Sequence, residues 1–269
     1  MLHFFALSEN KAGTDLKYHA HIKAMINSAK KNTKLKSIFI YDGKPNSLTK
    51  WLVKQDVEIV YHRSSIADFL IESKVNDKDN LLKDYNPDVA LGTFLRIDIP
   101  IIMDKLKLTD EVVLYTDCDV LFNMGLENDT IDLKGRPLCV CRETNYSAEN
   151  PYYNTGVMFI NIPVFRKSTK DFVKFIKESV KYHKFQDYDQ MAICMYYHGR
   201  IMDLTPYYNW RTFHGINKEA RIIHYHGIKI DEMKACVETG KHPIADLQGL
   251  YEHNRESVKY YYELFQTYI

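Results

Sequence analysis

The chain has 269 residues, with 36 basic and 35 acidic side chains and a formal net charge of +1. This balance argues against a protein that binds nucleic acid through many phosphate contacts. Hydrophobic residues make up 45% of the chain and charged residues 26%, as in a folded globular protein rather than a disordered one. The length suits one large α/β unit.

The cysteines and the first residues bear on the cellular compartment. The five cysteines form no Cys-x-x-Cys pair, and their odd number fits free thiols in a reducing compartment. The opening MLHFFALSEN has no basic region and no cleavage-site pattern, so we interpret it as a strand rather than a signal peptide. No apolar run is long enough to span a membrane. We therefore expect a cytoplasmic location, with the inner face of the membrane as an alternative.

Strand-like and helix-like segments alternate along the first half of the chain. There the sequence predicts strands at 2–7, 37–43, 57–62 and 112–116, and helices at 18–31, 47–53, 66–71 and 88–106, the last interrupted near Pro100. In the second half it predicts strands at 137–141, 156–162 and 221–226, and helices at 163–181, 187–197 and 252–265. This rhythm indicates an α/β protein with a mainly parallel, Rossmann-like central sheet flanked by helices.

The stretch EVVLYTDCDVLF, residues 111–122, carries the main chemical signal. A predicted strand delivers Asp117 and Asp119 to the edge of the sheet where its strands end, and open parallel sheets bind ligands at that edge. Two close carboxylates disfavour joint ionisation unless a cation compensates for their charge. Hard carboxylate oxygens suit Mg²⁺ or Mn²⁺. The alternative is a turn in which one aspartate caps the next segment.

Four segments follow one another in an order that resembles glycosyltransferase family 8. They are YTDCDVLF from Tyr115, NTGVMFIN from Asn154, DYDQ from Asp187 and HYHGIK from His224. The upstream FLRIDIP, from Phe94, is similar to that family's Tyr-x-Arg segment, and the resemblance covers about residues 1–230. It implies the GT-A fold and a retaining enzyme that uses a nucleotide sugar, usually a UDP-sugar.

The resemblance also implies a metal site. In the family, both aspartates and one late histidine hold a divalent ion, here Mn²⁺ or Mg²⁺. The matching residues are Asp117, Asp119 and His224, with His226 as the rival imidazole. The family's lysine beyond the glycine grips a diphosphate oxygen.

The chain departs from the family pattern after this histidine. The family continues its glycine with x-x-Lys-Pro-Trp, whereas Gly227 is followed by Ile228 and Lys229, and the Pro-Trp pair is missing. The resemblance therefore gives the diphosphate role to Lys229, with Lys234 as the alternative.

Three further residues receive catalytic roles from the resemblance. Arg96 approaches the donor sugar or its diphosphate, and a salt bridge on a helix face is its alternative role. Asp189 binds hydroxyls of the donor sugar, and Gln190 lies beneath the anomeric carbon. The alternative is that the acidic residues of this segment favour a helix N-terminus.

The implied donor-binding set is wider than the catalytic one. Asn154 matches the family asparagine that contacts the donor sugar. Its alternative role is an Asx turn before the strand. The first strand carries the family's uridine contacts. The whole set is Ala6, Ser8, Asn10, Arg96, Asp117, Cys118, Asp119, Asn154, Thr155, Asp189, Gln190, Gly227 and Lys229.

These expectations combine into one functional prediction. We predict a single domain over 1–269, with a nucleotide-sugar-binding lobe at 1–120 and an acceptor lobe with the terminal helix at 121–269. It moves a hexose, galactose or glucose, from a UDP-sugar to a glycan or a lipid-linked saccharide. The alternatives are a catalytically weak nucleotide-sugar-binding protein and glycogenin-like self-glycosylation, which the 20 tyrosines suggest. The aromatic terminal helix either packs on the core or contacts a membrane surface.

Overall fold

The computed structural model describes residues 1–9, 17–75, 86–126, 131–144, 151–179 and 188–269. Contacts divide the chain into two compact units made of interleaved segments. Unit 1 comprises Met1–Thr14, Lys36–Thr116 and Ile131–Leu204, and unit 2 comprises Asp15–Leu35, Asp117–Thr130 and Thr205–Ile269. The predicted lobes are defined by their ligands rather than by contacts, so their boundary at residue 120 stays a prediction.

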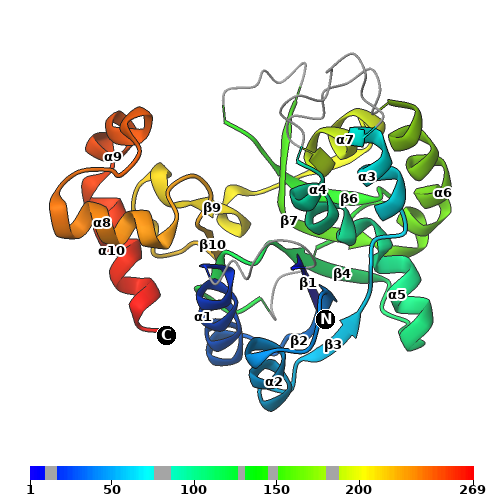
Figure 1. Cartoon of the computed structure of the whole chain (residues 1–269), viewed down its shortest axis with the longest axis horizontal. Helices are drawn as coiled ribbons and strands as arrows, with labels where there is room; N and C mark the ends of the chain where they lie inside the picture. The colour runs from blue at the N-terminus through cyan, green and yellow to red at the C-terminus, as the bar shows by residue number, and fades with distance from the viewer. Residues whose placement is uncertain (10–16, 76–85, 127–130, 145–150, 180–187) are drawn as a thin grey trace. The chain divides into compact units, whose positions relative to one another are not determined.

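Unit 1 is built on a seven-stranded sheet with the strand order β3-β2-β1-β4-β7-β6-β8 (Figure 1). The strands are β1 (Leu2–Ser8), β2 (Lys36–Asp42), β3 (Glu58–Tyr61), β4 (Val112–Thr116), β6 (Leu138–Arg142), β7 (Tyr153–Asn161) and β8 (Ile201–Leu204). The pairs β1–β2, β1–β4, β2–β3 and β6–β8 are parallel, whereas β4–β7 and β6–β7 are antiparallel. The sheet is therefore mainly parallel, as the sequence predicts.

Helices accompany this sheet within unit 1. They are α2 (Ser47–Lys54), α3 (Ala67–Val75), α4 (Pro87–Thr93), the 3₁₀ helix η1 (Phe94–Asp98), α5 (Ile99–Leu106), α6 (Ile162–Ser179) and α7 (Tyr188–Tyr196). The helices α3, α4 and α7 lie side by side (Figure 1). The run predicted at 88–106 is three elements. Pro100 stands in the first turn of α5, where its missing N–H leaves no helical bond unmade.

The first strand shows why the core of unit 1 forms where it does. Phe4 and Phe5 are neighbours on β1 and both are fully buried, as is usual for a central parallel strand. His3 is buried too, and its ring nitrogens lie 3.0 Å from Ser37 Oγ and 2.9 Å from Thr116 Oγ1. Burial lowers the pKa of His3 to about 3, so the ring stays neutral and ties β2 to β4 through its two hydrogen bonds.

Unit 2 contains a small three-stranded sheet in the order β5-β10-β9. In it, β5 (Val120–Phe122) is antiparallel to β10 (Ile222–His224), and β9 (Trp210–Arg211) is parallel to β10. The helices of unit 2 are α1 (Lys17–Asn32), α8 (Ile230–Thr239), α9 (Gln248–His253) and α10 (Arg255–Gln266), with 3₁₀ helices η2 (Pro206–Tyr208), η3 (Thr212–His214) and η4 (Ala245–Leu247). The sequence predicts β10 but neither β5 nor β9.

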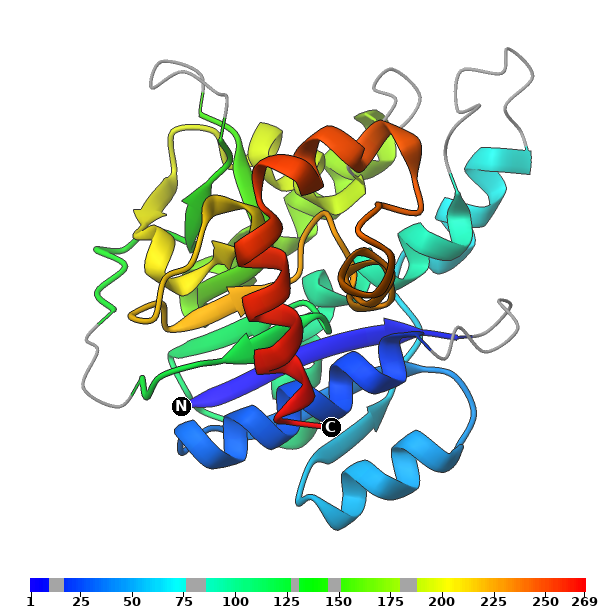
Figure 2. The ribbon, with the colours of Figure 1, turned by 90° about the vertical axis from the view of Figure 1, so that its left-hand side faces the viewer.

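The terminal aromatic segment belongs to the core of unit 2. The single helix predicted at 252–265 is two helices, because the chain breaks at Asn254 between α9 and α10. Val258, Tyr261 and Phe265 on α10 are buried. Figure 2 shows the end of α10, in red, beside α1 in blue, where Asn27 Nδ2 donates to the Tyr268 carbonyl at 2.7 Å. In the parts of the chain that the structure describes, no helix combines the length and apolarity needed to cross a bilayer.

Candidate metal centre and sugar-site residues

Three predicted metal ligands lie together in unit 2. Asp117, Asp119 and His224 each offer one ligand atom, and these atoms lie within 4.8 Å of one another. His224 Nε2 is 3.4 Å from Asp119 Oδ1 and 3.9 Å from Asp117 Oδ2. The pairing of β5 with β10 sets His224 opposite Val120, next in the chain to Asp119. The rival His226 is not a member of this cluster among the described residues.

The helix α1 fixes the strand that follows the acid pair. The Phe122 N–H donates to Ser28 Oγ at 3.1 Å, and Asn32 Nδ2 donates to the Phe122 carbonyl at 2.7 Å. On the other side, the Tyr225 N–H donates to the Asp119 carbonyl at 2.9 Å. The backbone that carries Asp119 is therefore held from two directions, by a helix and by the strand segment that carries the histidine.

Asn209 orients the candidate histidine ligand, and sequence reasoning missed it. His224 Nδ1 lies 2.8 Å from Asn209 Oδ1, which can only accept a hydrogen bond. The proton of the neutral ring therefore sits on Nδ1, and the lone pair of Nε2 faces the two carboxylates. Metal-binding histidines are usually oriented by such a partner on the second nitrogen. No pattern around Asn209 in the sequence signals this role.

Asp119 is a buried carboxylate with a cation already beside it. Lys229 Nζ forms an ion pair with Asp119 Oδ2 and also donates to the Tyr225 carbonyl at 3.1 Å. Burial alone would raise the pKa of Asp119, but Lys229 and His224 outweigh burial and hold that pKa well below its usual value. Burial would lower the pKa of Lys229, and Asp119 instead raises it above its ordinary value. The side chain of Asp117 is 32% exposed, so this carboxylate remains open to solvent.

The residues that follow Gly227 and depart from the family pattern form the start of helix α8. Lys229 is the N-cap residue of α8, and its backbone N–H donates to Glu232 Oε2 at 2.8 Å. Ile230 and Asp231 occupy the positions after the lysine and form the first turn of α8. Gly227 has a φ of 88°, and a Cβ there would meet the Phe213 ring at 3.3 Å, so the position favours glycine.

Lys229→Gln is expected to tighten Mn²⁺ binding by the nucleotide-free protein about tenfold, or by about 1.4 kcal/mol. Lys229 contacts a candidate metal ligand and repels a second cation, and glutamine removes both effects. Calorimetric titration with Mn²⁺ measures the change. Lys234→Gln is the matched control. The side chain of Lys234 is exposed, and its Nζ lies 3.9 Å from Glu238 Oε1. Unchanged or weaker Mn²⁺ binding by Lys229→Gln would contradict the contact between the Lys229 ammonium and the Asp119 carboxylate.

The charges of this cluster also affect the pKa values of two residues of α1. Burial, and next the negative charge of Asp119, raise the pKa of Tyr18 to about 12. Burial lowers the pKa of His21 to about 4, so its ring stays neutral against the rings of Tyr225 and Phe265. The sequence predicts the helix, but its approach to the acid pair depends on packing that no local pattern encodes.

The predicted sugar-binding residues form a second cluster, within unit 1. Arg96 Nε lies 3.2 Å from Asp189 Oδ2, and both side chains are about 5% exposed or less. Arg96 Nη1 also donates to the Thr155 carbonyl at 2.8 Å, and the guanidinium lies over the ring of Tyr115. The Thr155 hydroxyl donates to Asp189 Oδ2 at 3.3 Å. Arg96 is therefore a buried anchor of Asp189 rather than half of a surface salt bridge.

Gln190 and Asn154 complete this second cluster. The Thr155 N–H donates to Gln190 Oε1 at 3.1 Å, and Asn154 Nδ2 donates to Glu143 Oε1 at 2.7 Å. The sequence predicts that β7 begins at residue 156, but the strand begins at Tyr153. Asn154 and Thr155 are thus strand residues, although Asn154 Oδ1 does accept from the Gly156 N–H, as in an Asx turn.

The remaining predicted donor contacts are placed as follows. Ala6 and Ser8 lie on β1, and Ser8 Oγ donates to Asp42 Oδ2 at 3.2 Å. Cys118 is buried between the two aspartates. Asn10 lies outside the described residues. The roles of these residues toward a donor stay predictions.

A mainly parallel α/β sheet in unit 1, with an acid pair and a distant histidine gathered in unit 2, is the arrangement expected of a GT-A glycosyltransferase. The sequence profile of "Glycosyl transferase family 8" matches residues 12–230. The chain belongs to this family, as the resemblance of its motifs predicts.

Individual proteins are similar to this chain in sequence or in fold. "Probable glycosyl transferase Gly" of Streptococcus gordonii is 25% identical over 172 residues, which is 62% of this chain but 23% of that relative. This chain thus spans less than a quarter of that relative's length. The structure of the galactosyltransferase LgtC with donor and acceptor sugar analogues has a TM-score of 0.62 at 14% identity, covering 97% of this chain and 96% of that one. GlyE of Streptococcus pneumoniae TIGR4 has a TM-score of 0.60 at 15% identity, covering 97% and 63%. These structures confirm the GT-A fold.

Proposed function

We propose that the protein is a metal-dependent, retaining glycosyltransferase that uses a UDP-sugar. The observation that carries the proposal is the Asp117, Asp119 and His224 cluster in a chain of glycosyl transferase family 8. The transferred sugar is a hexose, galactose or glucose, and the likeness to a galactosyltransferase supports galactose. The acceptor is a glycan or a lipid-linked saccharide.

The chemistry of the three side chains fits a divalent ion. Asp117, Asp119 and His224 would hold Mn²⁺ or Mg²⁺ through two hard oxygens and one imidazole nitrogen. When bound, such an ion neutralises the negative charge that grows on the diphosphate as the glycosyl bond breaks. Asn209 keeps the proton of His224 on the nitrogen that faces away from the carboxylates.

Lys229 supplies a fixed positive charge beside the candidate metal ligands. Its ammonium lies against Asp119, and its backbone is pinned at the start of α8 by Glu232. A cation held in place near a leaving diphosphate stabilises developing charge without reorganisation. We assign to Lys229 the diphosphate contact that the family gives to its own lysine, despite the one-residue shift in sequence.

The cluster in unit 1 suits recognition of sugar hydroxyls. Asp189 is held by Arg96 and by the Thr155 hydroxyl, so its carboxylate cannot turn freely. Gln190 uses its oxygen to accept from the Thr155 N–H, which leaves its amide nitrogen as the donor. We assign the donor-sugar contacts of the family to Asp189, Gln190 and Asn154, with Arg96 as the residue that positions Asp189.

Other candidate functions receive less support. Self-glycosylation needs an accessible tyrosine. Tyr61 and Tyr207 are exposed, but Tyr115, Tyr197 and Tyr225 are core residues.

Membrane contact through α10 stays a prediction, and the burial of its aromatic face argues against it. A cytoplasmic location also stays a prediction. A donor-binding protein without turnover is the main alternative, because Pro-Trp is replaced by the start of α8.

A panel of UDP-hexoses tests the proposed function. We expect Mn²⁺-dependent release of UDP from one donor, UDP-galactose first, in the absence of an acceptor. Calorimetric donor binding without any UDP release would support the non-catalytic alternative. Neither binding nor release across the panel would contradict the proposal.

A further inference from the structure

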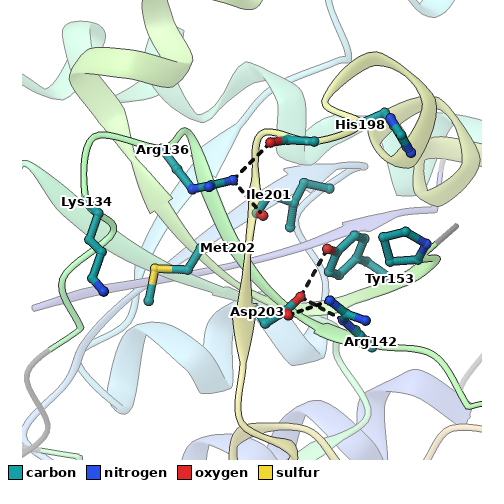
Figure 3. Close-up of a pocket in the computed structure, with 10 residues that line it drawn as sticks. Lys134, Arg136, Arg142, Tyr153, His198, Ile201, Met202 and Asp203 are labelled. Atoms are coloured by element: carbon teal, nitrogen blue, oxygen red, sulfur yellow. Dashed lines mark hydrogen bonds and ion pairs between the residues drawn. The ribbon is translucent and has the colours of Figure 1, made fainter. Parts of the chain in front are cut away.

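A separate polar cavity lies on unit 1 at the β8 edge of the large sheet. Figure 3 shows the residues that line it. The volume of the cavity is about 480 Å³. The turn before β6, the ends of β6 and β7, the turn after α7 and β8 itself contribute the residues that line it. None of these residues belongs to the sets assigned above to the metal, the diphosphate or the donor sugar.

One part of the cavity wall is electrically neutral. Arg142 donates to both oxygens of Asp203, from Nε at 2.9 Å and from Nη2 at 2.7 Å. The Tyr153 hydroxyl donates to the same carboxylate at 3.0 Å (Figure 3). Of the described residues that line the cavity, only Asp203 is acidic, and Arg142 already balances it.

The other part carries the cations Arg136 and Lys134, which form no ion pair among the described residues, although the charge of Arg136 also acts on Asp203 and Asp132 Oδ1 accepts from the Lys134 N–H at 2.8 Å. Arg136 Nη1 donates to the carbonyls of Gly199 at 3.0 Å and Ile201 at 3.3 Å (Figure 3). Carbonyl oxygens orient the guanidinium without cancelling its charge, and its remaining N–H groups are available to a ligand. Lys134 lies two residues earlier on the same turn, is exposed, and has no ion pair within the described part of the chain.

The turn that bears these cations has a defined shape. Lys134 and Gly135 have φ values of 48° and 72°, and the Arg136 N–H closes the turn on the Leu133 carbonyl at 2.8 Å. Lys134 and Arg136 therefore project from one hydrogen-bonded turn, and His198 lines the cavity from the turn after α7. An anion placed there gains charge-assisted hydrogen bonds from the guanidinium of Arg136, which two carbonyls already orient.

We propose that this cavity binds a phosphate-bearing saccharide. A guanidinium and an ammonium that form no ion pair among the described residues match a phosphate group, which accepts several hydrogen bonds and carries about two negative charges. The cavity is larger than a phosphate, and Tyr153, Pro151 and Met202 in its wall offer surface to a sugar ring. The anion part rests on the cavity alone. The saccharide part rests on the proposed function, since a glycosyltransferase acts on saccharide acceptors.

The test compares two lysines with the same backbone conformation. Lys134 and Lys107 are both exposed lysines of unit 1 with left-handed φ values, 48° and 55°. Asparagine tolerates this conformation, so Lys134→Asn and Lys107→Asn remove one charge each without a new strain. Calorimetric titrations in EDTA use inorganic phosphate and glucose 6-phosphate as probes. We expect Lys134→Asn to weaken the binding of both probes about tenfold and Lys107→Asn to leave it unchanged.

Each other result rejects a defined part of the proposal. Absence of phosphate binding to the wild-type chain, or equal effects of the two substitutions, overturns the anion site. Equal affinity for phosphate and glucose 6-phosphate overturns the saccharide part. Donor hydrolysis is measured on the same preparation. Hydrolysis without phosphate binding rejects the cavity alone, and phosphate binding with neither donor binding nor hydrolysis rejects the proposed function alone.

Discussion

Asp119→Asn should lower Mn²⁺-dependent donor hydrolysis by at least about 100-fold, because one charged ligand of the candidate ion disappears while the side chain keeps its shape. Asp119 is the more buried carboxylate of the pair and contacts both His224 and Lys229. An amide oxygen cannot supply the negative charge that a divalent ion requires there. The initial rate of UDP release measures the effect, and Mn²⁺ titration of the same variant should show weaker binding.

The control separates loss of the metal from loss of the fold. Asp246→Asn removes an exposed carboxylate of unit 2 and should leave the rate within about twofold, as expected of a surface substitution. Thermal unfolding in EDTA checks that Asp119→Asn remains folded. A variant that hydrolyses the donor at the wild-type rate would show that Asp119 does not serve the reaction.

Asp189→Ala should lower the free energy of unfolding by about 3–5 kcal/mol, because it leaves the guanidinium of Arg96 buried without a counter-charge. Both side chains are about 5% exposed or less, so water does not replace the lost partner. Urea unfolding at neutral pH measures this loss. The exposed pair between Arg166 and Asp104 provides the comparison, and Asp104→Ala should cost less than about 1 kcal/mol.

A double variant distinguishes a buried charge from lost packing. Arg96→Met with Asp189→Leu removes both charges and keeps apolar volume, so it should be more stable than Asp189→Ala. Wild-type stability of Asp189→Ala, or a cost equal to that of Asp104→Ala, would contradict the anchoring role of Arg96. The approach of Arg96 to the donor sugar or its diphosphate, which the family resemblance implies, stays a prediction.

The parallel half of the large sheet could be predicted because its strands are apolar runs bounded by turn residues. Phe4 and Phe5 illustrate this, since a strand buried on both faces reads as a continuous apolar segment. Of the small sheet only β10 was predicted, within the strand expected at 221–226. The strand β5 has three residues and β9 has two, which is too short for any periodicity to appear.

Some residues of the candidate site could be predicted from the sequence, and others could not. Asp117 and Asp119 could be predicted as a site because a strand ends in two acidic residues. That His224 lies close to them could be predicted only through the family resemblance. Asn209 and Tyr18 join the cluster through packing within unit 2, which has no local signature. The helix α8 did leave a signal, because Ile230, Met233 and Cys236 recur at helical spacing and Gly240 ends the helix.

The anomalous scattering of Mn²⁺ in crystals of the nucleotide-free protein shows whether Asp117, Asp119 and His224 hold one metal ion together. We expect one strong peak within about 2.5 Å of an oxygen of Asp117, an oxygen of Asp119 and Nε2 of His224, with Lys229 moved away from Asp119. We also expect the peak to disappear in crystals of Asp119→Asn. A manganese ion bound elsewhere, with the ion pair between Lys229 and Asp119 intact, would contradict the proposed metal site.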